Sequence, residues 1–413
     1  MKKTIILAGL LPSLLLARPA PAAPSLPQAE TAFSVALYGK LAAQPGNLFF
    51  SPYSIATAIG MVYAGAKGGT ATQIAHVLHL DQFAPNTPGP ALQAAYLRAL
   101  PQQHLLGDTQ ADGFKFNAAN AIWGADSYRF SPSFLAALKT SFGADLTPLD
   151  FTAPAAASTR INGWIADQTQ NKIQNLISPD MLTPDTRLLL TNAVYFKAAW
   201  ATQFDPSATD QEPFHLAPGT AVPTAMMNQQ DNFYLDTEDG VQVLTLPYRY
   251  NDASMVIILP TAQTGLPAIE AGLTADKLSR WVQNSQITLV AVTLPKFTTT
   301  STLGLNSVLS ALGMPNAFNP THANFTGVAG DPARPLYISA VLHQAKVDVD
   351  ENGTEAAAAT AVIMETATAS PDETPPQPVP FLADHPFLYL IRDNQSGNIL
   401  FMGRITDPTQ PGA

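Results

Sequence analysis

Cysteine is absent from this 413-residue chain. Its absence excludes disulfide bonds, thiolate metal sites, thiol nucleophiles and a lipid-bearing N-terminal cysteine, so the stability of the fold has to come from core packing. Charge is scarce as well: 13% of the residues are charged and 46% are hydrophobic, with a mean hydropathy close to zero. A chain of this composition and length can bury a large core, either as one large domain or as two ordinary ones.

Positive charge is the rarer sign. The chain has 21 Lys and Arg against 31 Asp and Glu, a formal net charge of -10. An acidic surface repels nucleic acid and anionic lipid. We therefore expect no nucleic-acid partner.

Long apolar runs are lacking everywhere except at the N-terminus. There, Lys2 and Lys3 precede an apolar run over residues 4–16, and Ala20-Pro21-Ala22 follows as an A-x-A pattern. This pattern predicts a signal peptide over residues 1–22 and hence a secreted or periplasmic protein, bacterial by the form of the signal. The alternative is an N-terminal membrane anchor, for which the run is short. The mature chain is then expected to have no membrane association.

Motifs of conventional enzymes are missing too. The seven histidines form no H-E-x-x-H pattern, and the chain contains neither a G-x-S-x-G elbow nor a phosphate-binding loop. We expect no metal, no cofactor and no catalytic activity. Composition alone cannot exclude a Ser/His/Asp triad, because such a triad is defined by its geometry in space.

Apolar periodicity predicts helices early in the chain and strands late, without βαβ alternation, which is typical of an α+β domain. Helices are expected at 30–43 and 55–64, helical hairpin and loop structure within 81–113, and a helical piece at 303–312. Strands are expected at 114–122, 188–196, 242–247, 254–259, 287–294, 336–349 and 387–391.

Five separated blocks carry a resemblance to a known family. They are residues 47–55, 190–200, 294–297, 336–347, and 385–387 taken with 400–405. In order and spacing they resemble the serpin family over nearly the whole mature chain. The resemblance implies a serpin fold with three β-sheets, surrounding helices and an exposed C-terminal reactive-centre loop at about residues 353–380. It also implies a single domain over residues 23–413.

A sixth block, residues 350–360, resembles the hinge of inhibitory serpins. Its hinge residues are Glu351, Gly353, Thr354, Glu355, Ala356, Ala357, Ala358, Ala359 and Thr360. Helix propensity alone would make the Ala-rich run a surface helix. In a strand, the even-numbered residues from Thr354 to Thr360 would face the core, and their small side chains would not obstruct entry between packed strands. Gly353 supplies a backbone pivot.

The resemblance also assigns residues inside the sheet that has to open. Ser51, Ser54, Asn192 and His343 match a polar cluster beneath the opening, and Trp200 matches the aromatic residue at the insertion point. Hydrogen bonds among such short side chains can hold strands closed and then exchange partners. The simpler interpretation is a set of satisfied core polar groups and one core Trp. Both interpretations can hold together.

The function implied by the resemblance is suicide inhibition of a serine protease by a metastable, monomeric molecule. In inhibitory members the scissile bond follows the hinge at a fixed spacing, and counting from Glu351 that spacing ends at Ala367, which predicts cleavage between Ala367 and Thr368. A small residue suits the shallow pocket of elastase-like enzymes. Met364, Glu365 and Thr366 are the alternatives if the register shifts, and Met364 or Glu365 would then suit chymotrypsin-like or glutamyl-specific proteases.

Two further features bear on this function. No Lys or Arg occurs between residues 353 and 386, which argues against trypsin-like targets. The stretch 368–380 is long and rich in proline, and proline cannot donate to a strand ladder, so this part should stay extended and solvated after cleavage. The alternative function is a non-inhibitory serpin acting as a binding or carrier module.

Overall fold

The computed structural model describes residues 25–100, 114–329, 335–354 and 377–411. Helices are concentrated in the first half of the chain, with three later ones. They are α1 (Leu26–Leu41), α2 (Pro52–Tyr63), α3 (Gly68–Val77), α4 (Leu80–Phe83), α5 (Gly89–Ala99), α6 (Pro132–Phe142), α7 (Pro154–Gln168), α8 (Leu266–Ala271), α9 (Ala275–Asn284) and α10 (Asn306–Leu312).

The strands form two hydrogen-bonded sheets. The six-stranded sheet has the order β10-β11-β12-β4-β2-β3, and the nine-stranded sheet has the order β1-β15-β14-β8-β7-β6-β9-β13, with β5 paired to β6. The six-stranded sheet consists of β2 (Phe114–Ala125), β3 (Leu146–Leu149), β4 (Leu188–Ala199), β10 (Phe297–Gly304), β11 (Ile338–Asp350) and β12 (Gly353–Thr354). The nine-stranded sheet consists of β1 (Leu48–Phe50), β5 (Asp210–Ala217), β6 (Thr220–Glu238), β7 (Val241–Pro247), β8 (Ala253–Pro260), β9 (Gln286–Pro295), β13 (Val379–Leu382), β14 (Phe387–Asp393) and β15 (Ile399–Ile405).

The α+β class and the serpin fold are confirmed, but the described residues form two connected sheets where three were expected. The reason is the 19-residue strand β6. Its first part pairs with β5, its middle with β9 and its last part with β7, so one continuous strand joins what would otherwise be two sheets.

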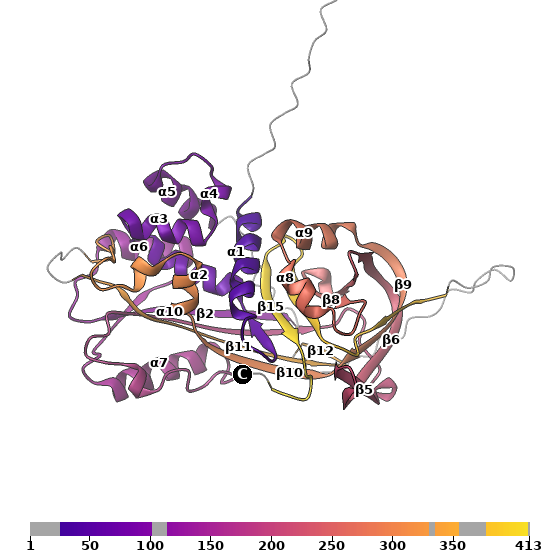
Figure 1. Cartoon of the computed structure of the whole chain (residues 1–413). Helices are drawn as coiled ribbons and strands as arrows, with labels where there is room; N and C mark the ends of the chain where they lie inside the picture. Colours follow the sequence, from indigo (N-terminus) through magenta and orange to yellow (C-terminus); the bar gives the residue numbers. More distant parts are fainter. Residues whose placement is uncertain (1–24, 101–113, 330–334, 355–376, 412–413) are drawn as a thin grey trace, which may run out of the picture.

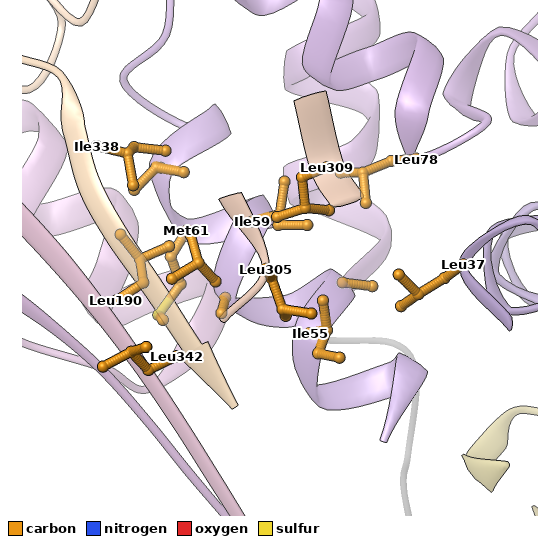
Figure 2. Packing of buried hydrophobic residues seen from close by; sticks show 14 of the residues in the cluster. Leu37, Ile55, Ile59, Met61, Leu78, Leu190, Leu305, Leu309, Ile338 and Leu342 are labelled. Carbon is orange, nitrogen blue, oxygen red and sulfur yellow. The ribbon is translucent and has the colours of Figure 1, made fainter. Parts of the chain in front are cut away.

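Most helices cover one face of the six-stranded sheet, whereas α7 lies on the opposite face (Figure 1). Helix α2 has a favourable N-terminus: the Ser51 hydroxyl accepts a hydrogen bond from the Ser54 N–H, and Pro52 occupies the first turn. Figure 2 shows Ile55 and Ile59 of α2 packed around Leu305, while Met61 of the same helix lies beside Leu190 of β4 and Leu342 of β11.

Two hydrophobic cores meet along β4 and β11. The first core lies under the helices and takes in Leu188 and Leu190 of β4. The second lies between the two sheets and takes in Val194 and Phe196 of the same strand. Position 192 between them is an asparagine, so the boundary between the two cores is polar.

Strand expectations were largely confirmed, while several local boundaries differ. The expected helix at 303–312 is shorter because residues 303 and 304 finish β10. The periodicity did not predict β3, β5, β6 or β10, which contain many Thr, Gln and Pro residues. Among the described residues no helix is long and apolar enough to cross a membrane. The predicted boundary at residue 22 between the signal peptide and the single domain lies outside the described residues, so it stays a prediction.

Candidate functional site: the seam between β4 and β11

The centre of the six-stranded sheet is a seam between two parallel strands. β4 and β11 pair directly from Leu188 and Ile338 up to Val194 and Ala345. Beyond this point β12 lies between them, antiparallel to both. Among the described residues, the sheet therefore holds two residues of an additional strand at one end of the seam, and the seam is closed where β4 and β11 pair directly.

A tight turn leads into β12. The Asp350 carboxylate accepts hydrogen bonds from the N–H groups of Asn352 at 2.8 Å and Gly353 at 3.2 Å. Gly353 has a φ of +152°, and a Cβ at this position would overlap the carbonyl oxygen of Ala198. A close approach of two backbones therefore requires glycine here.

Aromatic residues enclose the end of the inserted piece. Thr354 is buried, and its hydroxyl is 2.7 Å from the Tyr248 hydroxyl. Trp200 stacks on Tyr248 with ring centroids 4.7 Å apart, and its Nε1–H donates to the Asp350 carbonyl at 2.9 Å. Trp200 thus lies where the chain enters the sheet.

Glu351 anchors the turn from outside. Its carboxylate accepts hydrogen bonds from Lys296 Nζ at 2.7 Å and from the Thr209 hydroxyl at 2.8 Å. Burial raises the pKa of Glu351, but the bonds from Lys296 and Thr209 outweigh it and leave that pKa below its usual value. The first hinge residue is consequently held as a carboxylate.

The polar cluster lies midway along the seam. His343 and Asn192 face each other across it, and the His343 Nδ1 contacts the Asn192 side-chain oxygen. The Asn192 amide donates to the Ser54 hydroxyl and to Asn120, and the Ser54 hydroxyl donates to Asn120 at 2.8 Å. Three adjacent strands, β2, β4 and β11, are thereby tied to helix α2.

The tautomer of His343 follows from its partners. The Ser51 N–H donates to Nε2 at 3.1 Å, so Nε2 carries no proton. Complete burial lowers the pKa of His343 to about 3, which makes the ring neutral near pH 7. Its one proton is therefore on Nδ1 and is donated to Asn192 across the seam.

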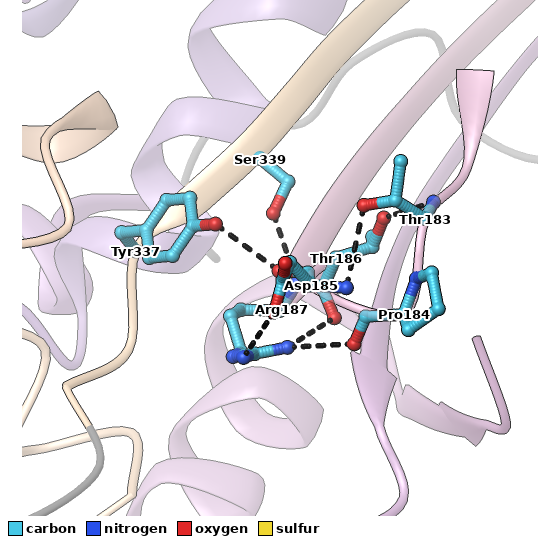
Figure 3. Close-up of polar contacts among 7 residues, drawn as sticks. All are labelled: Thr183, Pro184, Asp185, Thr186, Arg187, Tyr337 and Ser339. Carbon is cyan, nitrogen blue, oxygen red and sulfur yellow. Dashed lines mark hydrogen bonds and ion pairs between the residues drawn. The ribbon is translucent and has the colours of Figure 1, made fainter. Parts of the chain in front are cut away.

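The far end of the seam is closed by a third set of contacts (Figure 3). The Arg187 N–H donates to the Ser339 hydroxyl at 2.9 Å, and the Tyr337 hydroxyl donates to the Asp185 carbonyl at 3.1 Å. These bonds join the turn before β4 to the start of β11. The two strands are thus tied at both ends and in the middle.

The structure brings together Ser51, Ser54, Asn192 and His343, and it places Trp200, Glu351, Gly353 and Thr354 at one end of the same seam. The rest of the hinge, from Glu355 to Thr360, lies outside the described residues, as do Met364, Glu365, Thr366, Ala367 and Thr368.

Sequence reasoning missed three residues of the site: Asn120, Tyr248 and Lys296. Asn120 had a usable signal, because it is a polar residue within an otherwise apolar stretch of β2. Tyr248 had none, since its partner Thr354 is distant in sequence. Lys296 lies in the block 294–297, but nothing in that block indicates its pairing with the distant Glu351.

The family model described as "Serpin (serine protease inhibitor)" matches residues 28–408. The chain belongs to the serpin family. Serpins are named for inhibiting serine proteases and are not enzymes.

Relatives and solved structures agree with this membership. Human leukocyte elastase inhibitor is 38% identical over 93% of this chain and 99% of its own length. The crystal structure of Serpin48, described as a highly specific serpin of the insect Tenebrio molitor, has a TM-score of 0.79 and 32% identity over 92% of this serpin and 98% of that chain. Thyroxine-binding globulin in complex with thyroxine has a TM-score of 0.79 and 28% identity, covering 93% of this serpin and 100% of that chain.

The expectation of a secreted or periplasmic protein was wrong. Leukocyte elastase inhibitors are matched over 99% of their own length, while the family match in this serpin begins only at residue 28. These relatives therefore contain almost nothing that corresponds to residues 1–22, and they contradict export. The physical reason is that two lysines and a short apolar run are compositional features, which do not by themselves determine a compartment.

In the described part of the chain, no group of three or more His, Asp or Glu side chains is arranged to hold a metal ion.

Proposed function

We propose that this serpin inhibits serine proteases as a suicide substrate: the protease cleaves the reactive-centre loop, and the freed loop enters the seam between β4 and β11 as a new strand while still esterified to the protease. Loop insertion by serpins is itself a recognised case of strand addition to a sheet. The protease supplies the serine nucleophile and forms the acyl ester, so the inhibitor needs no catalytic residue.

The observation that carries the proposal is the register of β12. Gly353 and Thr354 pair with Ala199 and Ala198 of β4 and with Asp350 and Val349 of β11. The same offset relates β4 to β11 where they pair directly, from Leu189 and Ala340 to Val194 and Ala345. An inserted strand can therefore extend from Thr354 without any slip in register.

Extending this register places each hinge residue. Ala356 and Ala358 would point inward beside Phe196 and Val194, which belong to the second core, so small side chains suit these positions. Thr360 would lie between Asn192 and His343, at the place where insertion separates them. Its hydroxyl could then take over the hydrogen bond that His343 Nδ1 loses.

The length of the seam fits the predicted scissile bond. In the same register, residue 364 would face Leu188, the first residue of the 12-residue strand β4. Ala367 would then lie just beyond the end of the sheet, where an attached protease can be accommodated. Cleavage before Met364 would leave the seam only partly filled.

Elastase-like specificity is the favoured target class. Ala367 suits a shallow pocket, and the absence of Lys and Arg from residues 353–386 disfavours trypsin-like enzymes. The similarity to human leukocyte elastase inhibitor, at 38% identity, supports the same class. We also infer that the inhibitor acts as a monomer against one protease molecule.

The alternative is a non-inhibitory serpin that acts as a binding or carrier module. The structure of thyroxine-binding globulin with its ligand has the same fold, so the fold alone does not decide between the two functions. The small residues of the hinge favour inhibition, because a carrier has no need for a loop that enters a sheet.

The deciding experiment mixes this serpin with pancreatic elastase and looks for an SDS-resistant complex, with mass spectrometry of the released C-terminal peptide. We expect a covalent band and a peptide that begins at Thr368. Cleavage without a band, also with chymotrypsin and with a glutamyl endopeptidase, would contradict inhibition. Ala367→Arg is the matched variant: it should move complex formation from elastase to trypsin if the register is right.

A further inference from the structure

An asparagine followed by a glycine occurs twice in this chain, at Asn352-Gly353 and at Asn162-Gly163. Such pairs are chemically labile, because the glycine nitrogen can attack the carbonyl carbon of the asparagine side chain and glycine has no Cβ to hinder that attack. Whether the attack takes place in a folded protein depends on how the side chain and the nitrogen are held. The structure holds the two pairs very differently.

The Asn162 side chain is locked. Asn162 lies inside α7, its Nδ2 donates to the Ile177 carbonyl at 2.7 Å, and its Oδ1 accepts from the Ile177 N–H at 3.0 Å. Gly163 is the next residue of the same helix, so its nitrogen cannot turn toward the side chain unless the helix breaks. We expect this pair to be stable in the folded protein.

Asn352 lies in the turn between β11 and β12, at the entry to the seam. Its backbone is held: the N–H donates to the Asp350 carboxylate at 2.8 Å, and the carbonyl accepts from the Trp200 N–H at 3.0 Å. Among the described residues, however, nothing bonds its side-chain amide, and the residue is only half-buried. The side chain can therefore rotate toward the Gly353 nitrogen, and water has access to it.

The nitrogen of Gly353 has a base beside it. Its N–H donates to Asp350 Oδ1 at 3.2 Å, so a carboxylate oxygen faces the proton that the nitrogen has to lose before it can attack. This distance is at the long end of the normal range for such a bond. The contact thus polarises the N–H but holds the nitrogen less firmly than a helix would.

From these contacts we propose that Asn352 is a site of spontaneous deamidation, and that the conversion turns the inhibitor into a substrate of its protease. The Gly353 nitrogen bonds to Asn352 Cγ and loses its proton, the bond from Cγ to Nδ2 breaks, and ammonia leaves with that proton. Water then opens the cyclic imide at either carbonyl and gives aspartate or isoaspartate. The loss of inhibition rests on the proposed function, whereas the deamidation itself does not.

Isoaspartate is the damaging product, because the chain then passes through the former side chain and gains a methylene before Gly353. The added bond lengthens the turn by about 1.5 Å. Gly353 cannot absorb this shift: a Cβ there would overlap the Ala198 carbonyl oxygen, so the two backbones are already in close contact. β12 would lose its register against Ala199 and Ala198, and the hinge would enter the seam displaced. Aspartate keeps the chain length, so it should leave insertion intact.

The chemical test incubates the folded serpin in mildly alkaline buffer and maps its peptides by mass spectrometry, with enzymatic labelling of isoaspartate. We expect the mass gain of an amide-to-acid conversion and the isoaspartate label at Asn352, and neither at Asn162. In denaturant both asparagines should convert, because the protection of Asn162 comes from α7 and Ile177. An unmodified Asn352, or equal conversion of the two asparagines in the folded protein, would overturn the proposal.

The functional test follows the yield of SDS-resistant complex with elastase as the serpin ages. The yield should fall in proportion to the isoaspartate at position 352, and cleaved serpin should replace the complex. Asn352→Gln is the matched control: it keeps the amide, but its longer side chain closes the ring unfavourably, so its yield should stay constant. Fresh Asn352→Asp should form complex as well as fresh wild type does, which separates the added charge from the added methylene.

The outcomes distinguish this proposal from the inhibitory function itself. A yield that stays constant while isoaspartate accumulates, or a fresh Asn352→Asp that is already inactive, would refute the assignment of the loss to isoaspartate. Fresh wild type that forms no complex with elastase, chymotrypsin or a glutamyl endopeptidase would count against inhibition. In that case the peptide map alone decides whether Asn352 is the deamidation site.

Discussion

His343 joins the two strands of the seam through a single neutral ring. Its Nε2 accepts from Ser51, and its Nδ1 donates to Asn192. Protonation would place a second hydrogen on Nε2, facing the Ser51 N–H, in a site without water access. The closed seam therefore depends on the ring staying neutral.

Acid should weaken the closed form through this residue. Burial lowers the pKa of His343 to about 3 from 6.5, so the unfolded chain takes up a proton as the pH falls through 6.5 and the native chain does not. Stability is thus fully present above pH 6.5 and is lost progressively toward pH 3. Between pH 7 and pH 4 the free energy of unfolding should fall by roughly 3 kcal/mol. Denaturant unfolding of wild type and His343→Gln at both pH values measures it, and an equal change in both proteins would refute it.

Thr360 should matter only after cleavage. Thr360→Val keeps the shape of the side chain but removes its hydroxyl, so in the inserted strand it would leave His343 and Asn192 without their partner. The cleaved form should lose about 1–3 kcal/mol, and the intact form should be unaffected. Guanidinium unfolding of both forms measures this. Thr368→Val, beyond the scissile bond, is the control, and a loss of the same size in that variant would exclude the assigned position.

At the scale of the element, the seam is a pair of parallel strands that β12 separates at one end. β12 already holds the two ends of β4 and β11 apart, while Arg187 and Tyr337 close the other end. Opening has to proceed from β12 toward the polar cluster. The inward positions of the new strand then meet the core one after another.

The alternation of inward and outward side chains along the inserted hinge can be tested with a pair of variants. Ala358→Arg would force a charged side chain inward beside Val194 and Ala345, whereas Ala357→Arg would point outward to solvent. We expect Ala358→Arg to be cleaved as a substrate, with less than about a tenth of the wild-type yield of SDS-resistant complex. Ala357→Arg should retain most of that yield. Equal yields from the two variants would contradict the register.

For the whole molecule, insertion of the cleaved loop into the seam would add a strand to the six-stranded sheet. A completed sheet gains backbone hydrogen bonds along both sides of the new strand and buries more of the second core. The melting temperature should therefore rise by at least about 10 °C when the loop is cleaved. Calorimetry before and after limited proteolysis measures the rise. Cleaved Ala358→Arg is the control, which should melt close to the intact protein; a wild type that behaves the same way would favour the carrier function.

The family membership, the α+β class and the polar residues of the cluster followed from the sequence, because they rest on local patterns and ordered motifs. The hinge beyond Thr354 lies outside the described residues and stays a prediction. Propensity misled at β5 and β6, whose polar residues hide the strands. The compartment was misjudged from an N-terminal composition.

The sequence by itself determined the small-residue composition of the stretch after Gly353 and the presence of a helix soon after Ser51, since both depend on neighbours a few residues away. Only the tertiary structure decided that β4 and β11 are parallel partners and that Asn120 completes the cluster. Those contacts join residues tens to hundreds of positions apart. Their register is set by packing of the whole sheet, which no local propensity encodes.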